Sequence, residues 1–170
     1  DQLKELNLLK IYDNSSLDLL ILNDGHKHSI LLQNFIVNNK KLSGCNIKLE
    51  NLDFFKQREI SRCASPLILS INTFHNIEFL KKIEDISIEN RVNFINISLF
   101  GNKSYIGPLF SIEDGPCSEC LNRSNIIKDD DFHEVLGYSY NALSDLVINE
   151  IIRFVRERTY VNSFNTVIKI

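Results

Sequence analysis

Apolar residues along this 170-residue chain form short continuous runs separated by stretches with helical spacing. Residues 17–22 are nearly all apolar and end at Asn23-Asp24-Gly25, the pattern of a strand buried on both faces and followed by a tight turn. Residues 66–72 repeat this pattern, and residues 45–52 alternate as a strand does, with Cys45, Ile47 and Leu49 on one side. From residue 29 to 39 the apolar positions recur at helical spacing. The first part of the chain therefore predicts alternating strands and helices.

The second part continues this alternation. Asn72 or Thr73 is predicted to cap a helix whose apolar positions include Ile77 and Leu80. Strands are predicted over 92–99 and 104–112, joined by a turn at Gly101-Asn102. A long helix over 139–156 would bury Leu146 and direct Glu150 outward, and residues 166–170 read as a last strand. We expect one α/β domain over residues 1–170, with a Rossmann-like, mostly parallel sheet, flanking helices and right-handed connections.

Composition and charge narrow the class of protein. The formal net charge is -3 and the sequence pI is about 5.8, which argues against a broad surface for nucleic acid or anionic membrane. No run approaches the roughly 18 consecutive apolar residues of a membrane span, and the charged N-terminus is unlike a signal peptide. We expect a cytoplasmic protein with reduced thiols. The sequence contains no methionine, not even at position 1, so we expect it to be cut from a longer chain.

The turn after the first strand is where a doubly wound fold would hold a nucleotide. Here it reads Asn23-Asp24-Gly25-His26-Lys27-His28 and offers a single glycine, whereas phosphate-binding loops use several. No P-loop sequence occurs elsewhere. His26 and His28 would be metal ligands in one interpretation, but polar residues of an exposed turn are the preferred one. His75 and His133 are isolated, and the acidic stretch at 128–131 is expected to form a loop.

The segment 106–123 carries the clearest chemistry. Cys117 and Cys120 follow Gly115-Pro116, and two thiols at this spacing suit a knuckle that holds one zinc ion at Zn–S distances of about 2.3 Å. They supply half of the four ligands of a structural site. Cys45 and Cys63 could supply the other half, but single cysteines within strands are poor knuckles, and a second pair beyond residue 170, or a site that has been lost, is the preferred interpretation. Plain structural thiols and a redox pair are the alternatives, although the strand order does not follow the thioredoxin pattern. No nucleophile elbow of the G-x-S-x-G type is present.

The string Gly107-Pro108-Leu109-Phe110, followed by Gly115-Pro116-Cys117-Ser118-Glu119-Cys120-Leu121-x-Arg123, resembles a signature of ThiF-like proteins. These proteins are partner subunits of the cyclodehydratases that make thiazole- and oxazole-modified bacteriocins. The resemblance covers most of residues 17–170, while its specific part is confined to the Gly-Pro and cysteine segment. It implies a Rossmann-like fold, with this segment joining the core of the domain to its later part.

The wider superfamily adenylates C-terminal carboxylates and carries a glycine-rich first turn, which this chain lacks. The resemblance therefore implies a non-catalytic scaffold, with no catalytic residue in this domain. Such a scaffold helps to present a ribosomal precursor peptide to a YcaO-type, ATP-dependent cyclodehydratase. Its expected partners are that enzyme and the precursor peptide. A homodimer is a further expectation for the chain. The alternative is an active adenylyltransferase that acts on a peptide or carrier-protein carboxylate.

Overall fold

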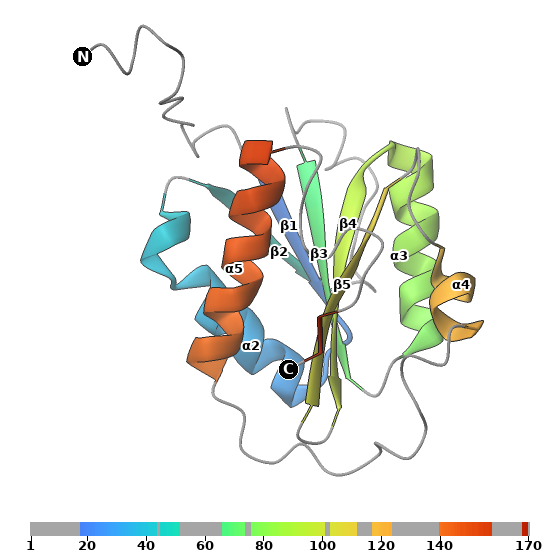
Figure 1. Cartoon of the computed structure of the whole chain (residues 1–170), viewed down its shortest axis with the longest axis horizontal. Coiled ribbons are helices and arrows are strands. Elements are labelled where there is room, and N and C mark those ends of the chain that lie inside the picture. The colour runs from blue at the N-terminus through green and yellow to red at the C-terminus, as the bar shows by residue number, and fades with distance from the viewer. Residues whose placement is uncertain are drawn as a thin grey trace, which may run out of the picture.

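The computed structural model describes residues 18–43, 45–51, 66–73, 76–100, 103–111, 117–123, 140–157 and 168–169. Within them, six strands form one sheet in the order β2-β1-β3-β4-β5-β6 (Figure 1). The strands are β1 (Asp18–Asn23), β2 (Asn46–Asn51), β3 (Pro66–Thr73), β4 (Asn93–Phe100), β5 (Lys103–Phe110) and β6 (Ile168–Lys169). The helices are α2 (Lys27–Val37), the 3-10 turn η2 (Lys40–Leu42), α3 (Ile77–Asn90), α4 (Ser118–Arg123) and α5 (Tyr140–Glu157).

Four neighbouring strands are parallel, and the predicted mostly parallel sheet is confirmed. β1 lies between β2 and β3 and pairs with both in parallel register, with Leu20 opposite Lys48 on one side and Ile68 on the other. β4 continues the parallel set, and β5 returns antiparallel to it as the predicted hairpin partner. Because the chain leaves β1 toward β2 and later returns to the opposite side of β1, the topology reverses between β1 and β3. In doubly wound sheets this switch point is where ligands bind.

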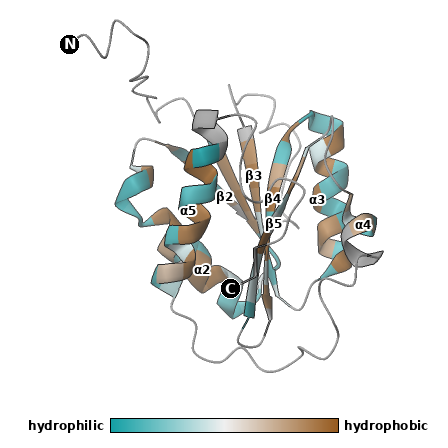
Figure 2. Cartoon of the chain, viewed as in Figure 1, coloured by the Kyte–Doolittle hydropathy of each residue, from teal (hydrophilic) through white to brown (hydrophobic). Residues whose placement is uncertain are grey.

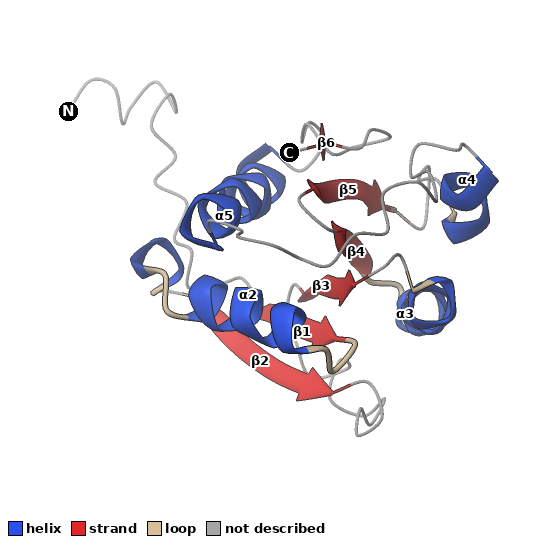
Figure 3. Ribbon diagram, turned by 90° about the horizontal axis from the view of Figure 1, so that it is seen from below, coloured by secondary structure: helices blue, strands red, loops and turns tan. Residues whose placement is uncertain are grey.

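Helices cover both faces of the sheet (Figure 3). α2 and α5 lie side by side on one face, where the rings of Phe35 and Tyr140 stack with centroids 5.7 Å apart, while α3 and α4 lie on the other. Alternate strand residues bury Leu19, Ile21 and Leu69 toward α2 and α5, and the residues between them toward α3. Figure 2 shows the same division as hydrophobic strands between helices whose polar sides face outward. The continuous apolar runs of the strands are explained by burial on both faces.

Three details differ from the sequence-based expectations. The cap of α3 is Asn76, whose side-chain oxygen accepts a hydrogen bond from the Phe79 amide at 3.0 Å. Asn72 is instead still within β3. On α5 the predicted orientations are reversed at two positions. Glu150 is 4% exposed and pairs with Arg153 at 3.6 Å, whereas Leu146 is 42% exposed.

The cap of α3 differs because β3 extends through Thr73 and the helix begins only after Asn76. The two differences on α5 share another origin: the packing of α5 against α2 and the sheet sets which helix positions are covered, and a local periodicity cannot show it. No helix in the described part of the chain is long and apolar enough to cross a membrane.

Candidate functional site

The switch point at the carboxyl ends of β1 and β3 is bridged by Asp24. The Asp24 amide donates to the Ile71 carbonyl at 3.2 Å. Its carboxylate oxygen Oδ2 accepts two hydrogen bonds from Thr73, one from the backbone amide at 2.7 Å and one from the hydroxyl at 2.8 Å. Thr73 is almost fully buried. A protein carboxylate therefore occupies a position that in many doubly wound proteins faces the ligand crevice.

The amides of the turn after β1 are hydrogen-bonded within the turn itself. The Gly25 amide donates to Asn23 Oδ1 at 2.8 Å, and the His26 amide donates to Asp24 Oδ1 at 3.1 Å. The His28 amide donates to His26 Nδ1 at 3.4 Å. Gly25 has a φ of 79°, which accounts for the glycine, and a Cβ there would meet nothing within 4 Å. A phosphate at this turn would have to replace these three side-chain acceptors with its own oxygens.

His26 and His28 connect the turn to α5. His26 caps α2, and its ring stacks on that of His28 with centroids 5.4 Å apart. His28 Nδ1 is hydrogen-bonded to the Tyr140 hydroxyl, and Tyr140 in turn stacks on Phe35. Burial raises the pKa of Tyr140 above its ordinary value of 10.0. The expectation of simple exposed turn residues was therefore wrong, because both imidazoles are half-buried. His28 joins α2 to Tyr140 of α5, and His26 caps α2 and stacks on His28.

A fully buried polar network lies behind the switch point, on the face of the sheet that α3 covers. Asn96 Oδ1 accepts from Asn72 Nδ2 at 2.7 Å and from Ser70 Oγ at 2.9 Å. Asn96 Nδ2 donates to Ser98 Oγ at 3.0 Å, and Ser98 Oγ donates to Asn72 Oδ1 at 3.2 Å. All four side chains are 0% exposed. The sequence carries only a weak signal of this cluster, namely polar residues at alternate positions of two β-rich runs, and the cluster was not predicted from it.

Cys117 and Cys120 meet on the α3 side of the sheet. Their sulfur atoms are 2.9 Å apart, and the Cys120 amide donates to Cys117 Sγ at 3.2 Å. Ser118, between them, is held by Glu84 of α3, whose carboxylate accepts from the Ser118 amide at 3.2 Å and from its hydroxyl. The two thiols therefore converge on one point at the surface, and α3 fixes the position of the turn that carries them.

The electrostatic surroundings of the pair keep Cys117 protonated. The pKa of Cys117 lies above its ordinary value of 9.0, mainly because its thiol hydrogen-bonds with Cys120, with a further contribution from the negative charge of Glu84. A bound cation would reverse this preference, since metal ligation deprotonates a thiol. The thiols are accessible, because Cys117 is half-buried and Cys120 is exposed.

Cys45 is not brought to this pair. It packs against the cluster beneath α2 and α5, on the opposite face of the sheet and at the β2 edge. Within the described residues, no histidine, cysteine or acidic residue joins Cys117 and Cys120 in a group that could hold a metal ion. Cys63, His75, His133 and the acidic stretch at 128–131 lie outside the described residues.

Several solved structures share this fold at low sequence identity. A heterocyclase solved with substrate and cofactor has a TM-score of 0.61 at 10% identity, over 92% of this chain and 23% of that one. The heterocyclase TruD has a TM-score of 0.56 at 13% identity, over 85% of this chain and 21% of that one. The microcin C7 biosynthetic enzyme MccB, in complex with N-formylated MccA, has a TM-score of 0.58 at 12% identity, over 93% of this chain and 62% of that one.

No protein-family profile matches the chain, and no curated protein sequence matches it significantly. The chain spans less than a quarter of the length of the two heterocyclases. At these identities the likeness establishes the Rossmann-like fold of the domain, and the predicted fold class is confirmed.

Proposed function

We propose that this domain is a non-catalytic, ThiF-like scaffold in a peptide heterocyclase assembly. In this role it helps to present a ribosomal precursor peptide to a YcaO-type, ATP-dependent cyclodehydratase during bacteriocin maturation. The fold it shares with domains of two heterocyclases and of a microcin biosynthetic enzyme supports a role in peptide modification. The Gly-Pro and Cys117/Cys120 segment supports the assignment to the ThiF-like partner subunits.

The closed switch point is the single observation that carries the non-catalytic part of the proposal. A nucleotide-binding turn needs backbone amides directed at phosphate and room for backbone approach. Here the amides of Gly25, His26 and His28 bond to side chains of the same turn, and the Asp24 carboxylate bonds to Thr73. A carboxylate at this place would also repel phosphate oxygens. The domain therefore contributes shape and docking, while ATP chemistry takes place on the YcaO-type partner.

The cysteine pair fits half of a structural zinc site. In a tetrahedral site with Zn–S bonds of about 2.3 Å, two sulfurs lie about 3.8 Å apart. The sulfurs of Cys117 and Cys120 are 2.9 Å apart, so they would need to separate by only about 0.9 Å to bind one zinc ion. The Cys120 amide already donates to Cys117 Sγ, a bond that stabilises a thiolate. Zinc would then clamp the segment after β5, and the remaining ligands would come from outside the described residues.

Reconstitution tests the proposal. A precursor peptide, ATP and a YcaO-type partner are incubated with and without this protein, and azoline formation is followed by mass spectrometry as the loss of one water per ring. We expect modification to be efficient only when this protein and the partner are both present. A tethered or captured substrate reaches roughly millimolar effective concentration, which is the physical basis of the expected stimulation.

The contradicting outcome is equally specific. Azolines formed by this protein and ATP alone would show a catalytic site within it. ATP–pyrophosphate exchange that depends on a peptide carboxylate would favour an active adenylyltransferase. An unchanged azoline yield when the protein is omitted would remove the scaffold role.

A further inference from the structure

The outer surface of α2 is nearly free of charge, unlike that of α3. Among the 11 residues of α2 only Lys27 is charged. α3 has 14 residues, and its charged ones are Glu78, Lys81, Lys82, Glu84, Asp85 and Glu89. In place of charges, α2 presents Ile30 (41% exposed), Leu31 (43%) and Phe35 (38%) to the surface. A surface with few charged residues and with exposed aliphatic and aromatic side chains has the composition of the core of a protein interface.

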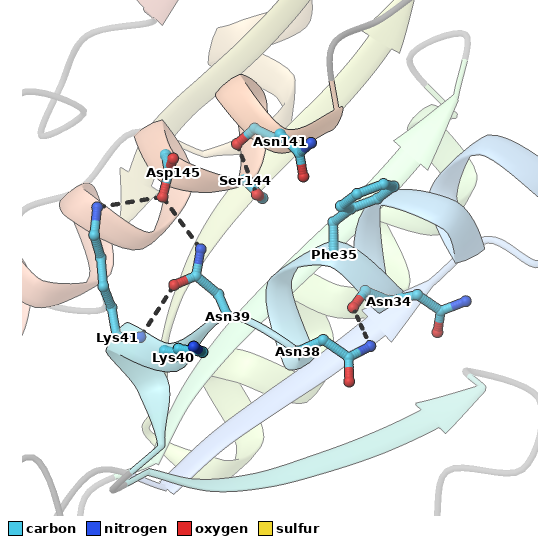
Figure 4. Close-up of a pocket in the computed structure, with 9 residues that line it drawn as sticks. All are labelled: Asn34, Phe35, Asn38, Asn39, Lys40, Lys41, Asn141, Ser144 and Asp145. Atoms are coloured by element: carbon cyan, nitrogen blue, oxygen red, sulfur yellow. Dashed lines mark hydrogen bonds and ion pairs between the residues drawn. The ribbon is translucent and has the colours of Figure 1, made fainter.

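A groove of about 630 Å³ adjoins these side chains, between α2, η2 and the start of α5 (Figure 4). We call it the asparagine groove. Its lining residues are Asn34, Phe35, Asn38, Asn39, Lys40, Lys41, Asn141, Ser144 and Asp145. In Figure 4, the Phe35 ring and Asn141 lie across the groove from Lys40, with Asn34 and Asn38 along the α2 side. Side-chain amides both donate and accept hydrogen bonds, so they match the peptide groups of an extended chain.

Lysines outnumber carboxylates around the groove. Residues 25–49 contain Lys27, Lys40, Lys41 and Lys48 and no aspartate or glutamate. Lys41 is neutralised by Asp145 of α5 at 3.2 Å, and the same carboxylate accepts from Asn39 at 3.1 Å. Within the described residues, Lys27 and Lys40 have no such carboxylate. Lys27 shares a helical stripe with Leu31, Asn34 and Asn38, and Lys40 lies at the far end of the groove.

We propose that the α2 surface and the asparagine groove together bind an acidic, apolar peptide segment. Carboxylates of the segment would pair with Lys27 and Lys40. Its apolar side chains would cover Leu31 and Phe35, and its backbone would bond with the amides of the groove. The two lysines are about 15 to 20 Å apart along the helix, which an extended segment spans in about five or six residues. The residues that line the asparagine groove include none of the switch-point turn or of the cysteine pair, and only Lys27, at the start of α2, adjoins that turn.

Two other occupants fit less well. A second copy of this chain, docked through the same surface, would bring lysines against lysines and a concave groove against another. An anionic membrane would pair with the lysines and the apolar side chains, but it would leave the concave, amide-lined groove without hydrogen-bonding partners. A peptide satisfies the charge, the apolar area and the amides together.

Fluorescence anisotropy tests the inference on the full chain with three labelled synthetic peptides. The first contains leucine, phenylalanine and glutamate, the second has lysine in place of glutamate, and the third has serine in place of the apolar residues. We expect saturable binding of the first peptide only, weakened by salt. Leu31→Glu and Lys40→Glu should each weaken it by about tenfold. Ile88→Glu and Lys82→Glu, which change exposed α3 positions in the same way, should change it by less than about twofold.

Circular dichroism of each variant confirms that it is folded. Equal binding of the lysine peptide, or equal effects of the α2 and α3 variants, would overturn the inference. So would phosphatidylglycerol vesicles binding where the acidic peptide does not, or self-association of the protein that Leu31→Glu abolishes. None of these results depends on a cyclodehydratase, so they separate this inference from the scaffold role, which the azoline assay tests.

Discussion

Replacement of Asp24 by alanine removes the carboxylate that joins the end of β1 to the end of β3. The side chain accepts hydrogen bonds from the Thr73 amide at 2.7 Å, the Thr73 hydroxyl at 2.8 Å and the His26 amide at 3.1 Å. Thr73 is only 5% exposed, so water cannot easily replace the lost acceptor for its amide. The variant therefore leaves a buried donor unsatisfied at the switch point.

The magnitude follows from these contacts. A hydrogen bond to a charged group stabilises a fold by about 1.5 to 3 kcal/mol, and an unsatisfied buried donor costs about 1 to 3 kcal/mol. Asp24 is half-buried, so water compensates part of the loss at His26. We expect Asp24→Ala to lower the free energy of unfolding by about 2 to 4 kcal/mol. For a chain of this size that corresponds to a fall in Tm of about 5 to 15 °C.

Thermal and urea unfolding, followed by circular dichroism, measure this loss. Asp24→Asn keeps one accepting oxygen and should lose about half as much stability. Asp85→Ala on the exposed surface of α3 is the matched control and should change stability by less than about 0.5 kcal/mol. If Asp24→Ala is no less stable than Asp85→Ala, the carboxylate does not close the switch point and the reasoning fails. Asp24→Ala should also leave ATP binding undetectable, since the turn amides of Gly25 and His28 keep their side-chain acceptors.

Three further predictions concern the buried network and the thiols. Asn96→Ala should lower the free energy of unfolding by about 3 kcal/mol or more, because Asn72, Ser70 and Ser98 each lose a hydrogen-bond partner in a dry interior. Urea unfolding measures this, and a loss below about 1 kcal/mol would contradict the network. The raised pKa of Cys117 should make its alkylation by iodoacetamide slower below pH 9 than that of a free thiol, and the rate should still rise above pH 9. Mass spectrometry of the labelled peptide measures the rate. A rate that reaches its plateau below pH 8 would contradict the raised pKa. Glu84→Ala should speed that alkylation by removing a negative charge and a contact to Ser118, whereas Asp85→Ala should leave it unchanged.

The sheet could be predicted from the sequence because its strands are apolar on both sides. The predicted strand 17–22 lies one residue before β1 at both ends. The predicted strand 66–72 begins with β3 and ends one residue before it. A strand buried on both faces has apolar residues at nearly every position, so it can be recognised from its own sequence without knowing which elements lie beside it. The parallel order then followed from the alternation of strands with helices.

The features that could not be predicted depend on contacts between distant residues. Asp24 and Thr73 are 49 positions apart, and His28 and Tyr140 are 112 positions apart. Several polar residues near position 73 were able to cap α3, and only the extension of β3 through Thr73 shows that Asn76 does so. The burial of Glu150 likewise depends on how α5 packs.

The cysteine pair combines a feature that the sequence predicts with one that it does not. Its spacing predicted that the two sulfurs would converge, and they lie 2.9 Å apart. Glu84, which binds Ser118 between the two cysteines, lies on α3, 34 positions away in the sequence. No sequence motif indicates this contact. Its effect on the pKa of Cys117 is therefore a property of the fold.

The scaffold role is tested most directly by the azoline assay with each component omitted in turn. Precursor peptide and ATP are supplied with this protein alone, with the YcaO-type partner alone, or with both. We expect dehydrated product in quantity only when both proteins are present, and none with this protein alone. Dehydrated or adenylated peptide formed by this protein and ATP without the partner would contradict it.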